Sequence, residues 1–208
     1  EPFKGRLLLG LTVVLGLFSG LAASGEWGRF LQWRNSTPFG MTDPQFGLDV
    51  SFYTFELPFL KFLLGFAFAA TFIALVLAVV VHYLFGGLRL QPKGDRATTA
   101  AQVQISITVA IFLFLKAIAY WVDRYDLVIQ SSDLAGGFTG LQYTDVNAKI
   151  PALNILTFVA LLVAVLFLFN AFRRQWIIPL IGLALMVLTS VIVGGVYPLI
   201  VQQFQVRP

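Results

Sequence analysis

The chain has 208 residues, of which 58% are apolar and only 12% are charged, and its mean hydropathy is +0.85. Soluble domains carry about 25% charged residues, so this composition excludes an ordinary soluble domain and predicts a polytopic membrane protein. The net charge of +4 is small and scattered along the sequence, which argues against nucleic-acid binding.

Five apolar segments are each long enough to cross a membrane as a helix, which needs about 20 mostly apolar residues. Helices are expected because a spanning segment in lipid must satisfy its backbone hydrogen bonds internally. We therefore predict an all-α fold over residues 1–208: one bundle of five transmembrane helices with ordered outer interfacial loops. The predicted spans are residues 7–24, 58–85, 99–122, 150–169 and 176–201.

The first segment imitates a secretory signal peptide, with a basic flank, an apolar stretch and small residues at its end. Because it is retained in the chain, a spanning helix is the favoured interpretation. The chain starts with Glu1 rather than Met, so we expect it to be processed or to be a fragment of a longer protein. Small residues at four-residue spacing, Gly16, Gly20 and Ser24, favour close approach of another helix. The sequence leaves open whether that helix belongs to this chain.

Residues 25–57 contain a short helical pattern followed by turn-forming residues. Trp27, Phe30 and Leu31 fall on one helical face, which is typical of a helix lying in the membrane interface. Aromatic residues between positions 52 and 59 are expected to anchor the chain at headgroup level as it re-enters the membrane. We predict an ordered interfacial cap. Its tight turns are assigned to Pro38, Gly40, Pro44 and Gly47.

Catalytic chemistry has little support in the sequence. Asp49 and Glu56 are the candidates for an acid–base pair, but no nucleophile, metal-ligand motif or oxyanion motif accompanies them. The chain has no cysteine and one histidine, which excludes disulfides, thiolate metal sites and iron–sulfur clusters. We therefore predict no catalytic residues, no metal and no cofactor.

Orientation is predicted from Lys and Arg residues, because short loops rich in them stay in the cytoplasm. The side of the N-terminus is richer in them, so we predict a cytoplasmic N-terminus and an extracytoplasmic C-terminus. Most acidic residues then lie outside, either as a solvated surface or as a vestibule that attracts cations. The basic residues on the N-terminal side are Lys4, Arg6, Arg89, Lys93, Arg96, Arg173 and Arg174.

Ionisable residues inside predicted spans are functional candidates. Lys61 is close enough to the start of the second span to reach the headgroups, and His82, near its other end, is either a polar anchor or a ligand of a pigment metal. Lys116 lies two helical turns before Asp123 on the same face. Lys116 therefore reaches the outer headgroups, pairs with Asp123, or contacts a substrate.

Two further patterns concern helix packing. Polar residues alternate at the start of the third span, so only part of the set can face the bundle, where it would line a polar inner vestibule. In the last span, Gly194 and Gly195 predict close packing or a kink, and Pro198 predicts a bend. The alternating residues are Gln102, Gln104, Ser106 and Thr108.

Several blocks of the sequence closely resemble one family. The blocks are TPFGMTDPQFGLDVSFYTFELPF, LKAIAYWVDRYDLV, YTDVNAKIPALNIL, FRRQWIIPLIGLAL and GGVYPLIVQQFQVRP. In order, and over about residues 7–208, they resemble the uncharacterised protein family 0182, large multi-pass bacterial membrane proteins. The resemblance implies a cell-membrane location and a longer chain, in which this region forms the last five spanning helices before a large extracytoplasmic region. It implies no catalytic or binding residue.

Two functions fit these observations. The first is a membrane scaffold or anchor that holds an extracytoplasmic domain or docks onto a larger membrane complex. The second is a transporter or channel subunit, in which polar groups around Lys116 line a pathway. We expect no enzymatic activity from these residues. The expected partners are membrane lipids and either other membrane-protein subunits or the missing parts of the same chain, and no nucleic acid.

Overall fold

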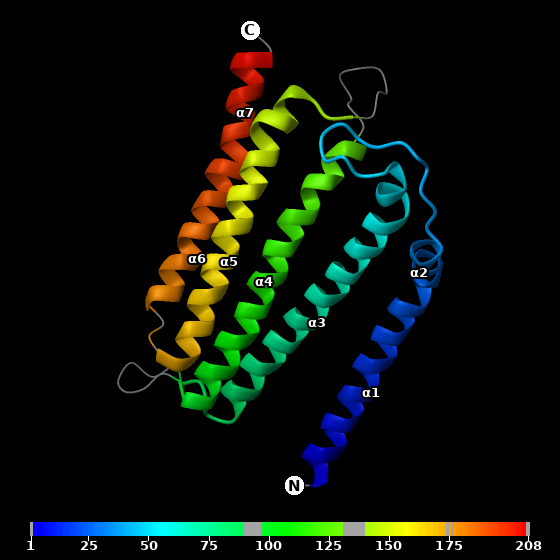
Figure 1. Ribbon diagram of the computed structural model, residues 1–208. Coiled ribbons are helices and arrows are strands. Elements are labelled where there is room, and N and C mark those ends of the chain that lie inside the picture. The colour runs from blue at the N-terminus through cyan, green and yellow to red at the C-terminus, as the bar shows by residue number, and fades with distance from the viewer. Residues whose placement is uncertain (1, 90–96, 131–139, 174, 176, 207–208) are drawn as a thin grey trace. The chain divides into compact units, whose positions relative to one another are not determined.

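The computed structural model describes residues 2–89, 97–130, 140–173, 175 and 177–206 (Figure 1). Its regular elements in this part of the chain are helices, joined by loops that contain two isolated β-bridges. The predicted all-α class is therefore confirmed for the described residues. The chain divides into two compact units, Glu1–Phe62 and Leu63–Pro208.

The first unit holds α1 (Pro2–Gly25), α2 (Trp27–Arg34) and a π-helical turn, η1 (Phe52–Glu56), that leads into α3 (Leu57–Leu84). The predicted short helix is confirmed as α2. Its aromatic residues pack against the first turn of α3, because the rings of Trp33 and Phe59 stack with centroids 4.8 Å apart. Aromatic pairs of this kind contribute stability beyond the area that they bury.

Backbone hydrogen bonds hold the loop between α2 and η1 together. Its two arms are joined by a β-bridge between Thr42 and Asp49 and by a hydrogen bond of 2.8 Å from the Val50 N–H to the Met41 carbonyl. Gly40 and Gly47 have φ angles of +74° and +67°, a left-handed conformation that glycine adopts without steric cost. These two glycines therefore make the reversals that the sequence assigns to them.

Four of the five predicted spans are confirmed as helices of sufficient length and apolarity to cross a membrane. The first predicted span lies within α1, where Thr12–Gly25 is the apolar stretch among the residues whose side chains the structure describes. Its crossing stays a prediction. The four long helices are Phe52–Leu84, Thr99–Ile129, Asp145–Arg173 and Ile177–Phe204.

Two helices extend beyond the limits of the predicted spans. The third span begins at Thr99 as predicted, but α4 (Thr99–Ile129) continues past Val122. Likewise α5 (Ile150–Arg173) continues directly from a π-helical turn, η2 (Asp145–Lys149), and ends later than residue 169. The predictions stopped where charged residues appear, whereas the α4 helix continues and Leu127 in its last turns is buried. Residues 131–139 of the predicted outer loop lie outside the described residues.

The last span combines α6 (Ile177–Thr189), a π-helical segment η3 (Ser190–Val196), α7 (Tyr197–Val201) and a π-helical turn, η4 (Gln202–Val206). The predicted close packing at Gly194 is confirmed, because a Cβ there would lie 3.2 Å from Leu156 Cδ1 of α5. Pro198 lies inside this continuous helix, two residues after the π-helical segment η3. Where the sequence predicts a kink or a bend in this span, the structure has the π-helical segment η3. Such segments are local distortions of α-helices.

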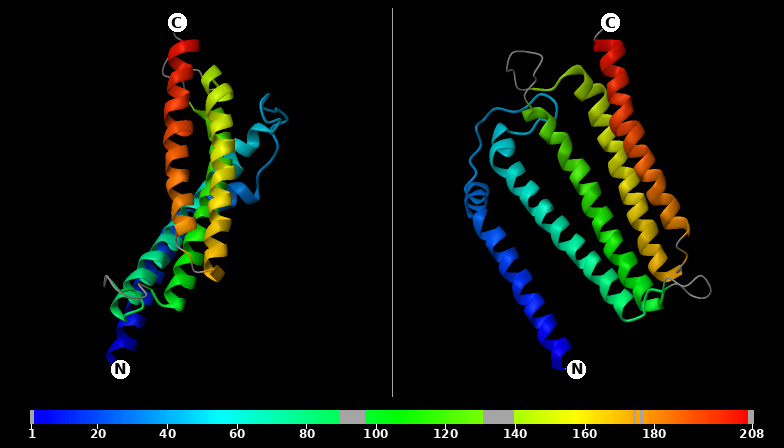
Figure 2. Two further views of the ribbon diagram at one scale, coloured as in Figure 1. Left: turned by 90° about the vertical axis from the view of Figure 1, so that its left-hand side faces the viewer. Right: turned by 180° about the vertical axis from the view of Figure 1, so that it is seen from behind.

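In the second unit α5 lies between α4 and α6 (Figures 1 and 2). Lipid tails are as apolar as a leucine side chain, so moving an apolar side chain from lipid to a helix contact gains no hydrophobic free energy. Helices in a membrane therefore associate through close packing. The α4–α5 contact is built that way, with alanines on both helices allowing the backbones to approach. Its buried cluster comprises Ala110, Leu113, Ala117, Tyr120, Leu156, Ala160, Val163, Ala164, Phe167 and Met186.

Candidate functional site

Near one end of the α4–α5 pair, a buried arginine bridges the two helices. Arg124 is only 8% exposed, and its Nη1 donates a hydrogen bond of 2.8 Å to Asn154 Oδ1 of α5. Its Nε donates to the Trp121 carbonyl at 3.1 Å, and the guanidinium lies over the Trp121 ring, 3.4 Å from the centroid. Arg124 follows the predicted span, which ends at Val122, so the sequence pattern placed it in a loop. Its aromatic neighbours in YWVDRYD were the available signal.

Near the other end, a neutral polar contact joins the same helices. Asn170 Nδ2 donates a hydrogen bond of 2.8 Å to Ser106 Oγ, and these residues are 3% and 0% exposed. Among the described residues, the Asn170 Oδ1 atom has no hydrogen-bond partner, and neither has Gln102 Oε1. A buried acceptor without a donor costs free energy. A ligand that donates a hydrogen bond to either oxygen would remove that cost. Asn170 was not singled out from the sequence.

The predicted division of the alternating polar residues is confirmed. Ser106 faces α5, whereas Gln104 reaches His82 of α3 and the Thr108 hydroxyl donates to the Gln104 carbonyl of its own helix. Between the polar contacts at the two ends, none of the described buried side chains of α4 and α5 is charged. The buried side chains of this helix pair are therefore apolar between those contacts.

Lys116 lies outside that apolar cluster. It is half-buried, and its ammonium lies 4.3 Å from the centroid of the Tyr120 ring, one turn further along α4. Asp123 lines a cavity of about 270 Å³ together with Asp126, Lys149 and Gly194. The pairing of Lys116 with Asp123 stays a prediction.

The Asp49 carboxylate organises the loop of the first unit. It accepts hydrogen bonds from the N–H groups of Phe39, Gly40 and Ser51, at 2.8–2.9 Å. These bonds, that from Phe39 foremost, lower the pKa of Asp49 to about 2. Such a carboxylate is a weak base whose two oxygens are already engaged, which does not suit acid–base work with Glu56. The geometry instead makes Asp49 a structural anchor.

Asp43 anchors the same loop from inside. Its carboxylate accepts a hydrogen bond of 2.7 Å from the Tyr53 hydroxyl and three more from the N–H groups of Gln45, Phe46 and Leu48. Burial raises the pKa of Asp43, but these hydrogen bonds together lower it more, so it lies below the ordinary value. No pattern in the sequence had indicated this role for Asp43.

We expect the loop to loosen as the pH falls from about 4 to about 2. The folded pKa of Asp49 is depressed from 3.8 to about 2, so its contribution to stability is complete above pH 3.8 and is lost as the pH falls through 2. Hydrogen-exchange protection of the Phe39 and Gly40 amides, measured against pH, reports this change. At neutral pH, Asp49→Ala should abolish that protection and Glu56→Gln should preserve it. Protection that survives Asp49→Ala would contradict the assignment.

His82 and Lys61 occupy polar positions on α3. His82 Nε2 forms a hydrogen bond of 2.9 Å with Gln104 Oε1 of α4. This contact between the two helices suits the polar-anchor interpretation. Lys61 is exposed in the first turns of α3. Among the described residues there is no group of three His, Cys, Asp or Glu side chains that could hold a metal ion.

Gly87 is closely packed against His82. A Cβ at this position would lie 2.7 Å from His82 Nδ1 and 3.2 Å from the His82 carbonyl oxygen. We expect Gly87→Ala to push the ring away from Gln104 and to lower the free energy of unfolding by about 1–3 kcal/mol. Thermal unfolding in detergent micelles measures this loss. The control is Gly65→Ala, where no neighbouring atom lies within 4 Å; equal losses in both variants would refute the packing argument.

The fold and these contacts define an all-helical protein with four helices, among the described residues, that are long and apolar enough to cross a membrane. Sequence comparison then assigns its family. The chain belongs to the Uncharacterised protein family (UPF0182), whose profile matches residues 1–208. This confirms the resemblance seen in the sequence.

Similar proteins come from several bacteria. The chain is 51% identical to UPF0182 protein SCO5204 of Streptomyces coelicolor, and 48% identical to both UPF0182 protein FRAAL6027 of Frankia alni and a UPF0182 protein of Nocardioides sp.. Each match covers the whole of this chain but only 20–21% of the relative. The chain thus spans about a fifth of the length of these relatives. No solved structure matches it.

Proposed function

We propose that this region is a membrane-embedded scaffold, which anchors a larger protein in the bacterial cell membrane. The observation that carries the proposal is the α4–α5 pair, which is held by polar contacts near both ends and is closely packed and apolar between them. Tight packing of small residues gives a rigid support, whereas a pathway for a polar solute would need polar groups along its length.

The exposed faces of the bundle support the same proposal. In the span Ile177–Phe204 only 17% of the most apolar stretch is buried, so most of its side chains are available to lipid or to another membrane protein. The relatives are about five times longer than this chain, which provides further chain for the spans to hold. The proposed partners are therefore membrane lipids and other membrane subunits or further parts of the same protein. We propose no enzymatic role for these residues.

The proposed orientation places the N-terminus in the cytoplasm and the C-terminus outside, on the basis of the basic residues described above. A single cysteine placed at Gln175, between α5 and α6, tests this. It should react with a charged thiol reagent that is added to inverted vesicles and not with one added to intact cells.

A transporter or channel subunit is the second candidate. The observation that favours it is the cavity of about 270 Å³ that Asp123, Asp126 and Lys149 line, because charges around a cavity are a feature of ion pathways. In this alternative Lys116, further into the span, would be the next polar group along the pathway. The apolar α4–α5 cluster argues against a route between these two helices.

Purification of the native protein in a mild detergent, followed by native mass spectrometry, tests the proposal. A scaffold should be recovered with other subunits at fixed stoichiometry, and its assembly should survive Lys116→Met. Solute uptake into proteoliposomes by the purified protein, abolished by Lys116→Met but preserved by Lys61→Met, would establish transport and refute the scaffold proposal. Lys61 is the matched control because it is a lysine near the end of another span.

A further inference from the structure

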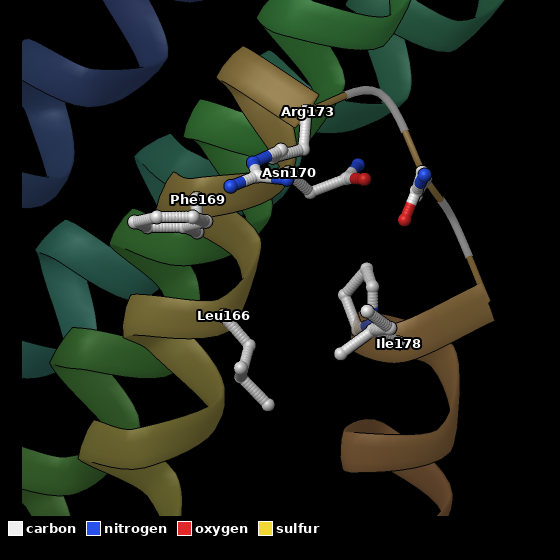
Figure 3. A pocket seen from close by; sticks show the side chains of 7 residues that line it. Leu166, Phe169, Asn170, Arg173 and Ile178 are labelled. Carbon is white, nitrogen blue, oxygen red and sulfur yellow. The ribbon is translucent and has the colours of Figure 1, made fainter.

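A second cavity lies where α5 ends and α6 begins (Figure 3). Its volume is about 150 Å³, enough for about five water molecules, which suits a small polar group. One spanning helix ends at Arg173 and the next begins at Ile177. The cavity therefore lies at the depth where these spans meet the headgroups of the membrane.

The lining of this cavity combines an acceptor, a cation and an apolar wall. Asn170 is almost fully buried, and its Oδ1 has no hydrogen-bond partner among the described residues, while its amide nitrogen is held by Ser106. Arg173 is exposed at the helix end, with its guanidinium 5.8 Å from the centroid of the Phe169 ring. The remaining lining residues are Leu166, Gln175, Ile178 and Pro179.

We propose that this cavity binds the headgroup of a phospholipid that carries hydrogen-bond donors, such as phosphatidylglycerol or phosphatidylethanolamine. The guanidinium of Arg173 would bind the phosphate, and a headgroup hydroxyl or ammonium would donate to Asn170 Oδ1. The acyl chains would follow the apolar side chains of Leu166 and Ile178. Basic cavities between spanning helices are suited to such headgroups. This proposal does not depend on the scaffold function.

Two features favour a lipid over a soluble phosphate ester. The cavity lies at headgroup depth by the limits of the two spans, and its apolar lining residues Phe169 and Ile178 are themselves exposed on α5 and α6. A soluble ester would leave that apolar wall uncovered. The acceptor on Asn170 adds selectivity, because the quaternary ammonium of phosphatidylcholine cannot donate a hydrogen bond whereas the other two headgroups can.

Native mass spectrometry of the detergent-purified native protein, with phosphatidylglycerol or phosphatidylcholine added in turn, tests the proposal. The wild-type protein should bind phosphatidylglycerol at least tenfold more tightly than phosphatidylcholine. A difference of about tenfold corresponds to the loss of one hydrogen bond to a buried acceptor. Arg173→Gln should weaken phosphatidylglycerol binding by roughly tenfold. Asn170→Leu should remove the preference between the two lipids.

Arg89→Gln is the matched control, because Arg89 is an exposed arginine just beyond the end of α3 and does not line this cavity. Its phosphatidylglycerol affinity should equal that of the wild type. Equal losses in Arg89→Gln and Arg173→Gln, or equal binding of the two lipids by the wild type, would overturn the proposal. Displacement of the lipid by millimolar sn-glycerol 3-phosphate would also overturn it, since the cavity would then serve a soluble phosphate ester. Arg173 is exposed, so its variant remains informative if Asn170→Leu fails to fold.

Discussion

Asn154→Leu should lower the free energy of unfolding by about 2 kcal/mol, the usual scale for a hydrogen bond to a charged group. Asn154 Oδ1 accepts the 2.8 Å hydrogen bond from Arg124 Nη1, and leucine would leave that buried guanidinium without its partner on α5. Unfolding in mixed detergent micelles, followed by circular dichroism, measures the change.

The neutral contact at the other end of the helix pair provides the comparison. Ser106→Ala removes an interhelical hydrogen bond between uncharged groups, and such bonds in membranes contribute about 0.6 kcal/mol on average. We therefore expect a distinctly smaller loss than for Asn154→Leu. A double-mutant cycle of Asn154→Leu with Arg124→Met measures the interaction between Arg124 and Asn154. The double variant should lose less free energy of unfolding than the sum of the losses in the two single variants. Additive losses would show that Arg124 and Asn154 are not coupled.

Ala160→Leu should have the second large effect, a loss of about 3 kcal/mol or a failure to assemble. Ala160 is 0% exposed and belongs to the buried α4–α5 cluster. A larger side chain there must force the two helix backbones apart. The expected loss is therefore at the upper end of the range for overpacking a core. The unfolding midpoint in detergent micelles measures this loss.

The control for overpacking is Ala69→Leu, which makes the same substitution at an exposed position in the middle of α3. Substitutions at such surface positions usually change stability by less than about 0.5 kcal/mol. If Ala69→Leu destabilised the protein as much as Ala160→Leu, the loss could not be ascribed to the α4–α5 contact.

The spans were predictable because apolar length is a local property of the sequence. Composition and segment length sufficed to locate four helices. They did not indicate how far each helix runs, because charged residues do not by themselves end a helix. Arg124 lies inside α4, since α5 supplies Asn154 as a partner from 30 positions away, a contact that no local pattern contains.

At the candidate sites, too, local features could be predicted from the sequence, whereas contacts between distant residues could not. The ordered loop after α2 was predictable from its prolines and glycines, whereas the anchoring roles of Asp43 and Asp49 depend on hydrogen bonds that only the folded loop brings together. Asn170 looked like one polar residue at the end of a long apolar run. Its importance appears only with Ser106, 64 positions earlier in the chain, and with the cavity that it lines.

The central claim, that the α4–α5 pair is closely packed without a water-filled path, is best tested by cysteine labelling, since the chain has no native cysteine. Single cysteines at Ala110 and Ala117 would be treated in native membranes with a charged thiol reagent, with Thr37→Cys in the loop as the accessible reference. In a scaffold without a water path, only Thr37→Cys should be modified in the folded protein, and all three cysteines should be modified after denaturation. Modification of Ala110→Cys and Ala117→Cys in the folded protein would place water between the helices and contradict the account.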